Sequence, residues 1–141
     1  MTVDGSAPAR LEAEVSIYDE VRAFGDSFVA ALAANDVEAI LDHFEPEARL
    51  IVPGRSPVAG HAELRAYFQA GPAGIHIKSY TTKEIFEDGS LVVEFGSEVF
   101  ADRHADGSIS DFPMSYVAVF RRGAEGRLRL LVDCVSPDIP D

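Results

Sequence analysis

Near the end of the chain, residues 128–135 read LRLLVDCV, an apolar run interrupted by Arg129 and Asp133. Side chains of a β-strand alternate between the two faces of its sheet. Strict alternation predicts Leu128, Leu130, Val132 and Cys134 on one face, with Leu131 and Val135 on the other. A strand that is apolar on both sides is typically buried on both sides. The run therefore predicts a sheet that is covered from two directions.

The segments before this run also have the pattern of strands. Apolar and polar residues alternate over residues 75–86, 91–102 and 111–121, and the last strand is expected over 127–135. Turn residues separate the segments, namely Asp88-Gly89, Asp106-Gly107 and the stretch 123–126. Turn signals at this spacing predict a meander of long antiparallel strands.

The first half of the chain has helical periodicity instead. Ser16 is a suitable N-cap for a helix, and Asp36 is suitable for a second one after Asn35. The first helix has its apolar stripe at Ile17, Val21, Phe24, Phe28 and Leu32, and the second at Val37, Ile40, Leu41 and Phe44, with Pro46 expected to end it. A short strand is expected over Ala48–Val52. A third helix contains Leu64 and Phe68 and ends at Gly71-Pro72.

Helices followed by a meander predict an α+β fold, in which three N-terminal helices pack on a strongly curved antiparallel sheet. The sheet is expected to form a cone with an interior pocket. Because the helices cover one face, a second copy of the chain is the simplest cover for the other, and we expect a homodimer. Residues 1–15 carry no periodic pattern and are expected to form a flexible arm before a single domain over 16–141.

The charge balance excludes several classes of partner. The chain has 12 Lys and Arg against 24 Asp and Glu, for a formal net charge of −12. Such a field repels phosphate backbones and anionic lipids, so we expect neither nucleic acid nor a membrane as partner. The polar start, the lack of a long apolar segment and the lone Cys134 predict a cytoplasmic protein.

Common catalytic and cofactor motifs are absent from the sequence. There is no phosphate-binding loop and no Gly-x-Gly-x-x-Gly, and the stretch around Gly54 lacks the second glycine of a nucleophile elbow. The histidines at positions 43, 61, 76 and 104 show no metal-ligand spacing. We therefore expect no cofactor and no metal.

Asp133 is the strongest candidate for a catalytic residue. A carboxylate in an apolar strand costs several kcal/mol, as an order of magnitude, unless it is paired or functional. Burial raises the pKa of a carboxyl, so Asp133 could transfer protons near neutral pH. Alternatively, it forms an ion pair with Arg129 on the same strand. Tyr116 is a second candidate, as a hydrogen-bond donor to a ligand, although a strand tyrosine often only packs its ring.

Other residues have a structural and a functional interpretation. The aromatic set Phe24, Phe28, Phe44 and Phe68 forms the core or lines the pocket of a half-open cone. Substrate contacts are also predicted for Val52, His76 and Leu131. His76 and Tyr80 are expected to share one strand face. Glu94 and Glu98 are expected on the solvated face of their strand, opposite an apolar row of Val93, Phe95 and Val99.

Three segments resemble the nuclear-transport-factor-2-like fold, and specifically its SnoaL-like and DUF4440-like members. Residues 28–44, FVAALAANDVEAILDHF, are similar to the opening helix pair of that family. Residues 58–68, VAGHAELRAYF, are similar to its third helix, and residues 116–133 to its closing hairpin. The resemblance covers about residue 17 to the end. It implies the fold more strongly than an activity, because the fold hosts isomerases, cyclases, dehydratases, epoxide hydrolases and non-catalytic modules.

Departures from the family narrow the expected chemistry. The ketosteroid isomerases that the chain resembles have a catalytic Asp where this chain has Val52, and their oxyanion tyrosine falls at Phe28. Of the Asp-Arg-Asp set of limonene-epoxide-hydrolase-like members, only the last Asp has a match, at Asp133. We therefore expect an isomerase, cyclase or lyase, other than a steroid isomerase, for an apolar, polyketide- or terpenoid-like substrate. The alternative is a non-catalytic dimeric binding or interaction module.

Overall fold

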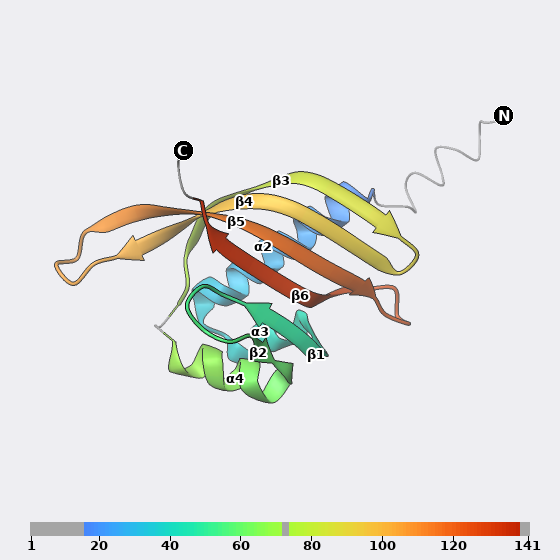
Figure 1. The fold of residues 1–141 in the computed structure, drawn as a ribbon, viewed down its shortest axis with the longest axis horizontal. Coiled ribbons are helices and arrows are strands. Elements are labelled where there is room, and N and C mark those ends of the chain that lie inside the picture. Colours follow the sequence, from blue (N-terminus) through green and yellow to red (C-terminus); the bar gives the residue numbers. More distant parts are fainter. Residues whose placement is uncertain (1–15, 72–73, 139–141) are drawn as a thin grey trace.

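The computed structural model of the protein describes residues 16–71 and 74–138, and it begins with the helices α2 (Ile17–Ala34) and α3 (Val37–Asp42) (Figure 1). Both N-caps are confirmed. The Ser16 hydroxyl accepts a hydrogen bond from the backbone N–H of Asp19 at 3.1 Å, and Asp36 caps α3 in the same way. Asn35 lies between the helices in the left-handed conformation, with φ of 54°. The predicted arm, residues 1–15, lies outside the described residues.

The strands form one six-stranded sheet in the order β2-β1-β6-β5-β4-β3. Their bounds are Phe44–Ile51 for β1, Val58–Ala59 for β2, Ile77–Asp88 for β3, Leu91–Arg103 for β4, Ile109–Arg122 for β5 and Leu128–Pro137 for β6. Helix α4 (Gly60–Ala70) lies between β2 and β3 in the chain. The predicted α+β class is confirmed. Pairing is antiparallel throughout except that β1 runs parallel to β6.

The periodicity predicts Phe44 in the second helix, but in the structure Phe44 lies outside that helix. Helix α3 ends at Asp42, and Phe44 opens β1 opposite Leu130 of β6. The backbone N–H of Leu130 donates to the carbonyl of His43 at 2.8 Å, so pairing with β6 replaces another helical turn. Pro46 lies inside β1, within a stretch where the pairing register with β6 shifts. Such an irregularity tolerates a residue that has no N–H to donate.

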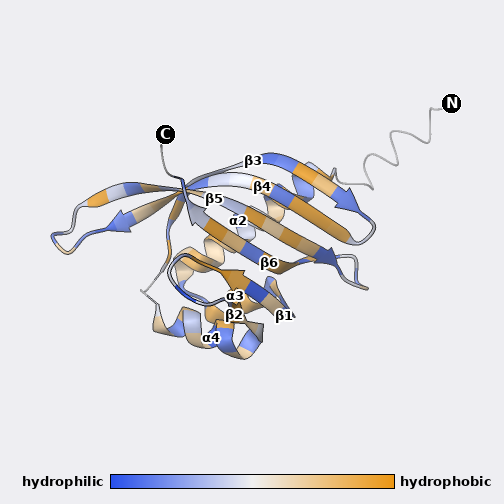
Figure 2. Ribbon diagram, viewed as in Figure 1, coloured by the Kyte–Doolittle hydropathy of each residue, from blue (hydrophilic) through white to orange (hydrophobic). Residues whose placement is uncertain are grey.

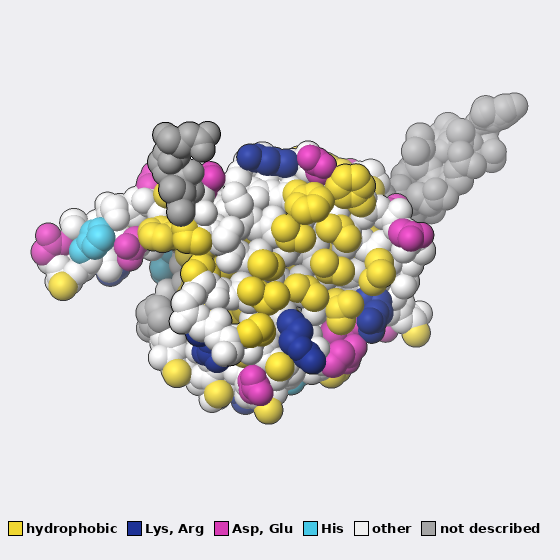
Figure 3. Space-filling model, viewed as in Figure 1, with side chains coloured by type: hydrophobic (Ala, Val, Ile, Leu, Met, Phe, Trp, Pro, Cys, Tyr) yellow, Lys and Arg dark blue, Asp and Glu magenta, His cyan; other side chains and the backbone are white. Residues whose placement is uncertain are grey.

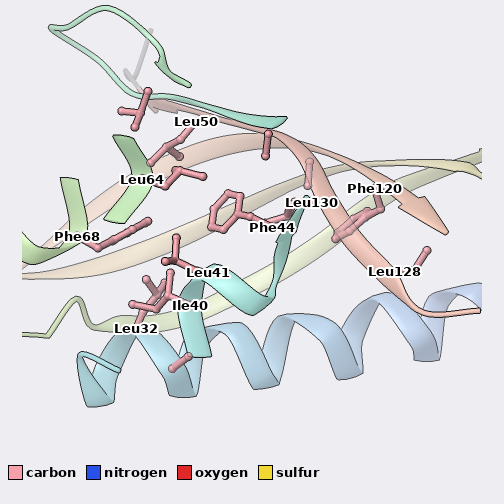
Figure 4. Close-up of a cluster of buried hydrophobic side chains, with 14 of the residues drawn as sticks. Leu32, Ile40, Leu41, Phe44, Leu50, Leu64, Phe68, Phe120, Leu128 and Leu130 are labelled. Atoms are coloured by element: carbon pink, nitrogen blue, oxygen red, sulfur yellow. The ribbon is translucent and has the colours of Figure 1, made fainter. Parts of the chain in front are cut away.

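The helices lie against one face of the curved sheet, with α2 behind β3–β6 and with α3 and α4 near β1 in Figure 1. Hydrophobic residues run along much of β4, β5 and β6 (Figure 2). Figure 4 shows the core between these layers, where Phe44 and Phe68 meet side chains from α2, α3 and the sheet. The core includes Leu32, Ile40, Leu41, Phe44, Leu50, Leu64, Phe68, Phe120, Leu128 and Leu130. This packing leaves part of the inner sheet face uncovered beside α2.

Three register shifts change which side chains face inward. In β6, Leu130 lies opposite Phe120 and Val132 opposite Val119, so Leu131 is an extra residue, a β-bulge. Similar shifts fall at Lys78 and at Lys83 of β3. The expected single face for Leu128, Leu130, Val132 and Cys134 is therefore wrong. Beyond Leu131 the alternation is offset by one residue, which turns Asp133 inward.

The outer face of the sheet is apolar, and none of the helices within residues 16–71 and 74–138 covers it. Figure 3 shows this face, where hydrophobic side chains gather over the strands. Phe86, Leu91 and Phe95 are exposed there, and the rings of Phe86 and Phe95 meet edge to face. Val117, Val119 and Val132 continue this surface, which we call the outer apolar patch. Among the described residues, no helix is long and apolar enough to cross a membrane.

Phe44→Ala should destabilise the fold by about 3–5 kcal/mol, because it removes a ring from the centre of the core. Phe44 is 1% exposed, whereas Ile109 is 54% exposed, lies in the β4–β5 hairpin outside the outer apolar patch and serves as the control. Ile109→Ala should cost less than about 1 kcal/mol. Urea unfolding followed by circular dichroism measures both values. Equal effects of the two substitutions would contradict the position of Phe44 in the core.

Candidate functional site

An apolar cavity opens between α2, α4 and the inner face of the sheet. The empty space along its walls, with the open solvent at its mouth included, is about 800 Å³. Its walls are mainly aromatic and aliphatic, and its polar side chains are Tyr67, Tyr80, Glu94, Glu98, Tyr116 and Asp133. The apolar lining includes Phe24, Phe28, Val29, Leu32, Leu50, Val52, Phe68, Ile75, Ile77, Phe100, Ala118, Phe120, Leu130 and Val135. An apolar cavity with a few convergent polar groups is typical of a small-molecule site.

The sheet register places the polar groups in adjacent rows. Glu94 lies opposite Ala118, and Ala118 lies opposite Asp133, so the two carboxyl groups flank one alanine across three strands. In the next row, Tyr116 lies opposite Gly96, and Glu98 follows two residues further along β4. The polar side chains of β4, β5 and β6 therefore share one inward patch.

Glu94 is the carboxyl group of the three that the described residues hold by hydrogen bonds. It is 4% exposed, and its Oε2 accepts hydrogen bonds from the Tyr116 hydroxyl at 2.6 Å and the Thr82 hydroxyl at 2.7 Å. Gly96 makes this possible, because a Cβ at that position would overlap the Tyr116 ring. Burial and the bond to Glu94 raise the pKa of Tyr116 above its ordinary value. Tyr116 thus remains a neutral donor that fixes Glu94.

Asp133 and Glu98 are less constrained. No described residue forms a hydrogen bond with either carboxyl group, although both line the cavity. Desolvation, and then the negative charge of Glu94, raises the pKa of Asp133 to about 7. Desolvation, followed by the charges of Asp133 and Glu94, raises the pKa of Glu98 to about 8. Both groups can therefore exchange protons near neutral pH.

Tyr80 closes the α2 side of the cavity. Its hydroxyl donates to Oδ1 of Asp26 at 2.6 Å, and its ring rests over Gly25 of α2. The Arg22 guanidinium stacks on the Tyr80 ring at 3.8 Å from the centroid and donates to the Tyr80 backbone carbonyl. Arg22 does not line the cavity. These contacts hold the ring of Tyr80 in place, and they hold the Arg22 guanidinium against that ring, outside the cavity lining.

Six of the residues predicted for the site line the cavity together: Asp133, Tyr116, Phe24, Phe28, Val52 and Phe68. Three do not. Phe44 is fully buried in the core, Leu131 is the extra residue of the β6 bulge, and His76 is exposed. The bulge at Lys78 also separates His76 from Tyr80, so their predicted common face is wrong. The role of each lining residue stays a prediction.

The sequence interpretation of Asp133, Glu94 and Glu98 requires correction. Arg129 pairs with Glu125, and it lies on the face opposite Asp133 because the Leu131 bulge intervenes. The two glutamates face the cavity and not solvent. Val92 is fully buried and lies on the same face of β4 as Glu94 and Glu98. This alternation is the feature of the sequence that indicates an inward direction for the two glutamates. The apolar row around Phe95 hid this signal, because it lies on the outer face.

No three acidic, histidine or cysteine side chains within the described residues are placed to hold a metal ion. None of the residues that line the cavity is His or Cys. The expected absence of a metal or cofactor stays a prediction.

The family comparison agrees with this architecture. A model described as SnoaL-like domain matches residues 26–131. The chain belongs to the SnoaL-like family. No curated protein matches it in sequence. Residues 26–131 contain α2 from Asp26 onward and most of the sheet, and Glu94, Glu98 and Tyr116 fall inside them, whereas Asp133 lies two residues beyond.

Solved structures of similar fold include three that are informative. An NTF2-like protein with a cystatin-like fold from Novosphingobium aromaticivorans has a TM-score of 0.79 at 14% identity, covering 100% of this chain and 94% of that one. A ketosteroid isomerase-like protein from Erwinia carotovora atroseptica has a TM-score of 0.76 at 17% identity, covering 90% and 100%. A protein from Catenulispora acidiphila in complex with S-DNPA has a TM-score of 0.71 at 25% identity, covering 89% and 96%. The first two likenesses establish the fold alone.

Glu98→Gln should stabilise the protein at pH 8.5 and change it little at pH 5. Because the pKa of Glu98 is raised, the unfolded chain loses its proton first as the pH rises, and stability declines between the ordinary carboxyl pKa and about 8. An amide avoids this cost, so a rise in Tm of about 4 °C or more is expected at pH 8.5. Thermal melts at the two pH values measure it.

Glu84→Gln is the matched control for this experiment, because Glu84 is exposed on the neighbouring strand β3. It should leave the Tm within about 1 °C at either pH. If Glu98→Gln gave the same Tm change at pH 5 as at pH 8.5, the raised pKa assigned to Glu98 in the folded protein would be wrong.

Proposed function

We propose that the protein is an acid/base enzyme, an isomerase, cyclase or lyase that acts on an apolar small molecule in this cavity. Asp133 is its proton-transfer residue. The observation that carries the proposal is the position of Asp133: a carboxyl group in an apolar cavity, without a hydrogen-bond partner among the described residues, and with a pKa of about 7. A general acid or base works best when its pKa is near the working pH.

The neighbouring Glu98 supports proton exchange in this cavity. Burial raises the pKa of both Asp133 and Glu98 toward neutral pH, so each carboxyl group can take either protonation state in the folded protein. Ionised Asp133 removes a proton from a substrate carbon and can return it to another atom of the substrate.

The cavity walls favour an apolar substrate. The rings of Phe24 and Phe28 from α2 and of Phe68 from α4 form one side, and Val52 lies beside them. Val52 and Phe28 occupy the places where the ketosteroid isomerases resembled by the chain have their base and oxyanion tyrosine, so steroid isomerisation is not proposed. The Catenulispora acidiphila neighbour, at 25% identity, is in complex with S-DNPA, which supports a small-molecule role for the fold.

Asp133→Asn should lower the rate of proton transfer by about a hundredfold to ten-thousandfold, the usual contribution of a positioned acid or base. The amide keeps the volume and is cheaper to bury, so the fold should survive. We would incubate the protein in D2O with a panel of apolar ketones, with and without an amino group. Mass spectrometry then measures deuterium incorporated at carbon.

Asp102→Asn is the control, because Asp102 is exposed near the end of β4. It should exchange deuterium at the wild-type rate. Equal exchange by wild type and Asp133→Asn would reject the role of Asp133. A panel member that binds without any exchange would favour a non-catalytic binding module.

We also propose that the chain forms a homodimer through the outer apolar patch. Phe86, Leu91 and Phe95 expose large apolar side chains on a sheet face that no helix covers. A second copy of the same face would bury them, and such self-complementary contact is the usual geometry of a two-fold dimer. The cavity opens on the other face, so dimerisation leaves it accessible.

Val119→Asp should shift the protein toward monomer, because it places a charge in the centre of this patch. Val119 lies between Val93 of β4 and Val132 of β6. Sedimentation velocity at micromolar concentration measures the change. Ile109→Asp is the control, since Ile109 is 54% exposed but lies in the β4–β5 hairpin outside the patch. A monomeric wild type would reject the dimer.

A further inference from the structure

The polar groups of the cavity are all oxygen groups. They belong to Tyr67, Tyr80, Glu94, Glu98, Tyr116 and Asp133, and none of the lining residues is Arg, Lys or His. An anionic ligand would therefore find three carboxyl groups and no positive charge inside the cavity. Coulomb repulsion at such a low-dielectric site would disfavour its binding.

Most of the hydroxyl protons beside the carboxyl groups are already used. Tyr116 and Thr82 donate to Glu94, and the single hydroxyl proton of Tyr80 is shared between Asp26 at 2.6 Å and the backbone carbonyl of Arg22 at 2.9 Å. The Tyr67 hydroxyl and the carboxyl groups of Glu98 and Asp133 keep free capacity in the cavity, because no described residue forms a hydrogen bond with them. Once ionised, Glu98 and Asp133 only accept hydrogen bonds, so the polar end of a ligand that binds this form has to donate.

The cations beside the cavity walls do not line the cavity. The Arg22 guanidinium stacks on the Tyr80 ring and donates to the Tyr80 backbone carbonyl. The exposed Arg55 lies 5.3 Å from the centroid of the Tyr67 ring and donates to the backbone carbonyl of Ser56, and neither arginine belongs to the lining. The carboxyl groups of the cavity are thus left without a protein counter-ion among the described residues. Their mutual repulsion contributes to the raised proton affinity of Glu98 and Asp133.

The cavity walls also suit a cation. The faces of aromatic rings attract positive charge. Phe24, Phe28 and Phe100 line the cavity together with the carboxyl groups. A ligand with a cationic end and an apolar body can therefore satisfy both parts of the lining.

We propose that the ligand carries a protonated amine as its polar end, which binds between Glu98 and Asp133, while its apolar body lies against Phe24, Phe28 and Phe68. This inference names the substrate class of the cavity and rests on the proposed function for the site. The ammonium group supplies the missing counter-ion and donates the hydrogen bonds that the carboxyl groups can accept. Its arrival lowers the pKa of both groups, so binding at pH 7 releases protons from the protein.

Calorimetric titration at pH 7 tests the proposal with three probes that share a phenylbutyl body and end in an amine, an alcohol or a carboxylate. The amine should bind at least about tenfold more tightly than the alcohol. A tenfold difference in affinity corresponds to the same free energy as a change of one unit in a pKa. The carboxylate should bind least. Titrations in phosphate and in MOPS, which differ in heat of ionisation, should show proton release with the amine and none with the alcohol.

Glu98→Gln should reduce the preference for the amine over the alcohol by about tenfold and lower the proton release. Glu84→Gln, on the exposed face of β3, should change neither quantity. Equal affinity for amine and alcohol, tight binding of the carboxylate, or no binding of the amine at millimolar concentration would overturn the inference. The deuterium experiment reports on proton transfer separately: exchange with ketones that lack an amine would reject this substrate class and leave the acid/base function intact.

Discussion

The alternation of side chains along β4, β5 and β6 is the constraint on which the cavity depends. A strand can direct only every second residue inward, and a bulge reverses this order beyond it. In β6, Leu130 faces the core, Leu131 is the extra residue and Asp133 then faces the cavity. Without the bulge, Asp133 would share the outer face with Arg129. One extra residue thus decides whether this carboxyl group is a surface ion or a group inside an apolar cavity.

The cavity also depends on small residues that make room for large ones. Gly96 allows the Tyr116 ring to lie across β4, and Gly25 allows Tyr80 to rest on α2. The two phenols are then held by hydrogen bonds, one to Glu94 and the other to Asp26. Their rings form fixed walls on either side of the carboxyl groups. Rigid support of this kind is what a site needs if a proton is to be transferred over a short and constant distance.

Local signals made much of the fold predictable, whereas long-range pairing did not. Ser16, Asn35 and Asp36 mark helix ends through their own backbone contacts, and the glycine turns mark the hairpins. Phe44 was misplaced because its strand exists only through contact with Leu130, 86 residues away. Asp133 could be identified as unusual from its apolar neighbours. The inward direction of Glu94 and Glu98 could not be identified in the same way, because both faces of β4 carry apolar residues, Val92 on one and Phe95 on the other.

The same carboxyl groups link stability to function. Glu98 and Asp133 lie where ionisation is costly, and an apolar residue at either position would remove that cost. The neighbouring Glu94 shows that the protein can satisfy a buried carboxyl group, since two hydroxyls bond to it. Glu98 and Asp133 receive no such bonds from the described residues, so their oxygens and their protons stay available to a ligand. A cationic ligand would reduce the repulsion among these carboxyl groups, so the same charges that lower the stability of the fold would favour its binding.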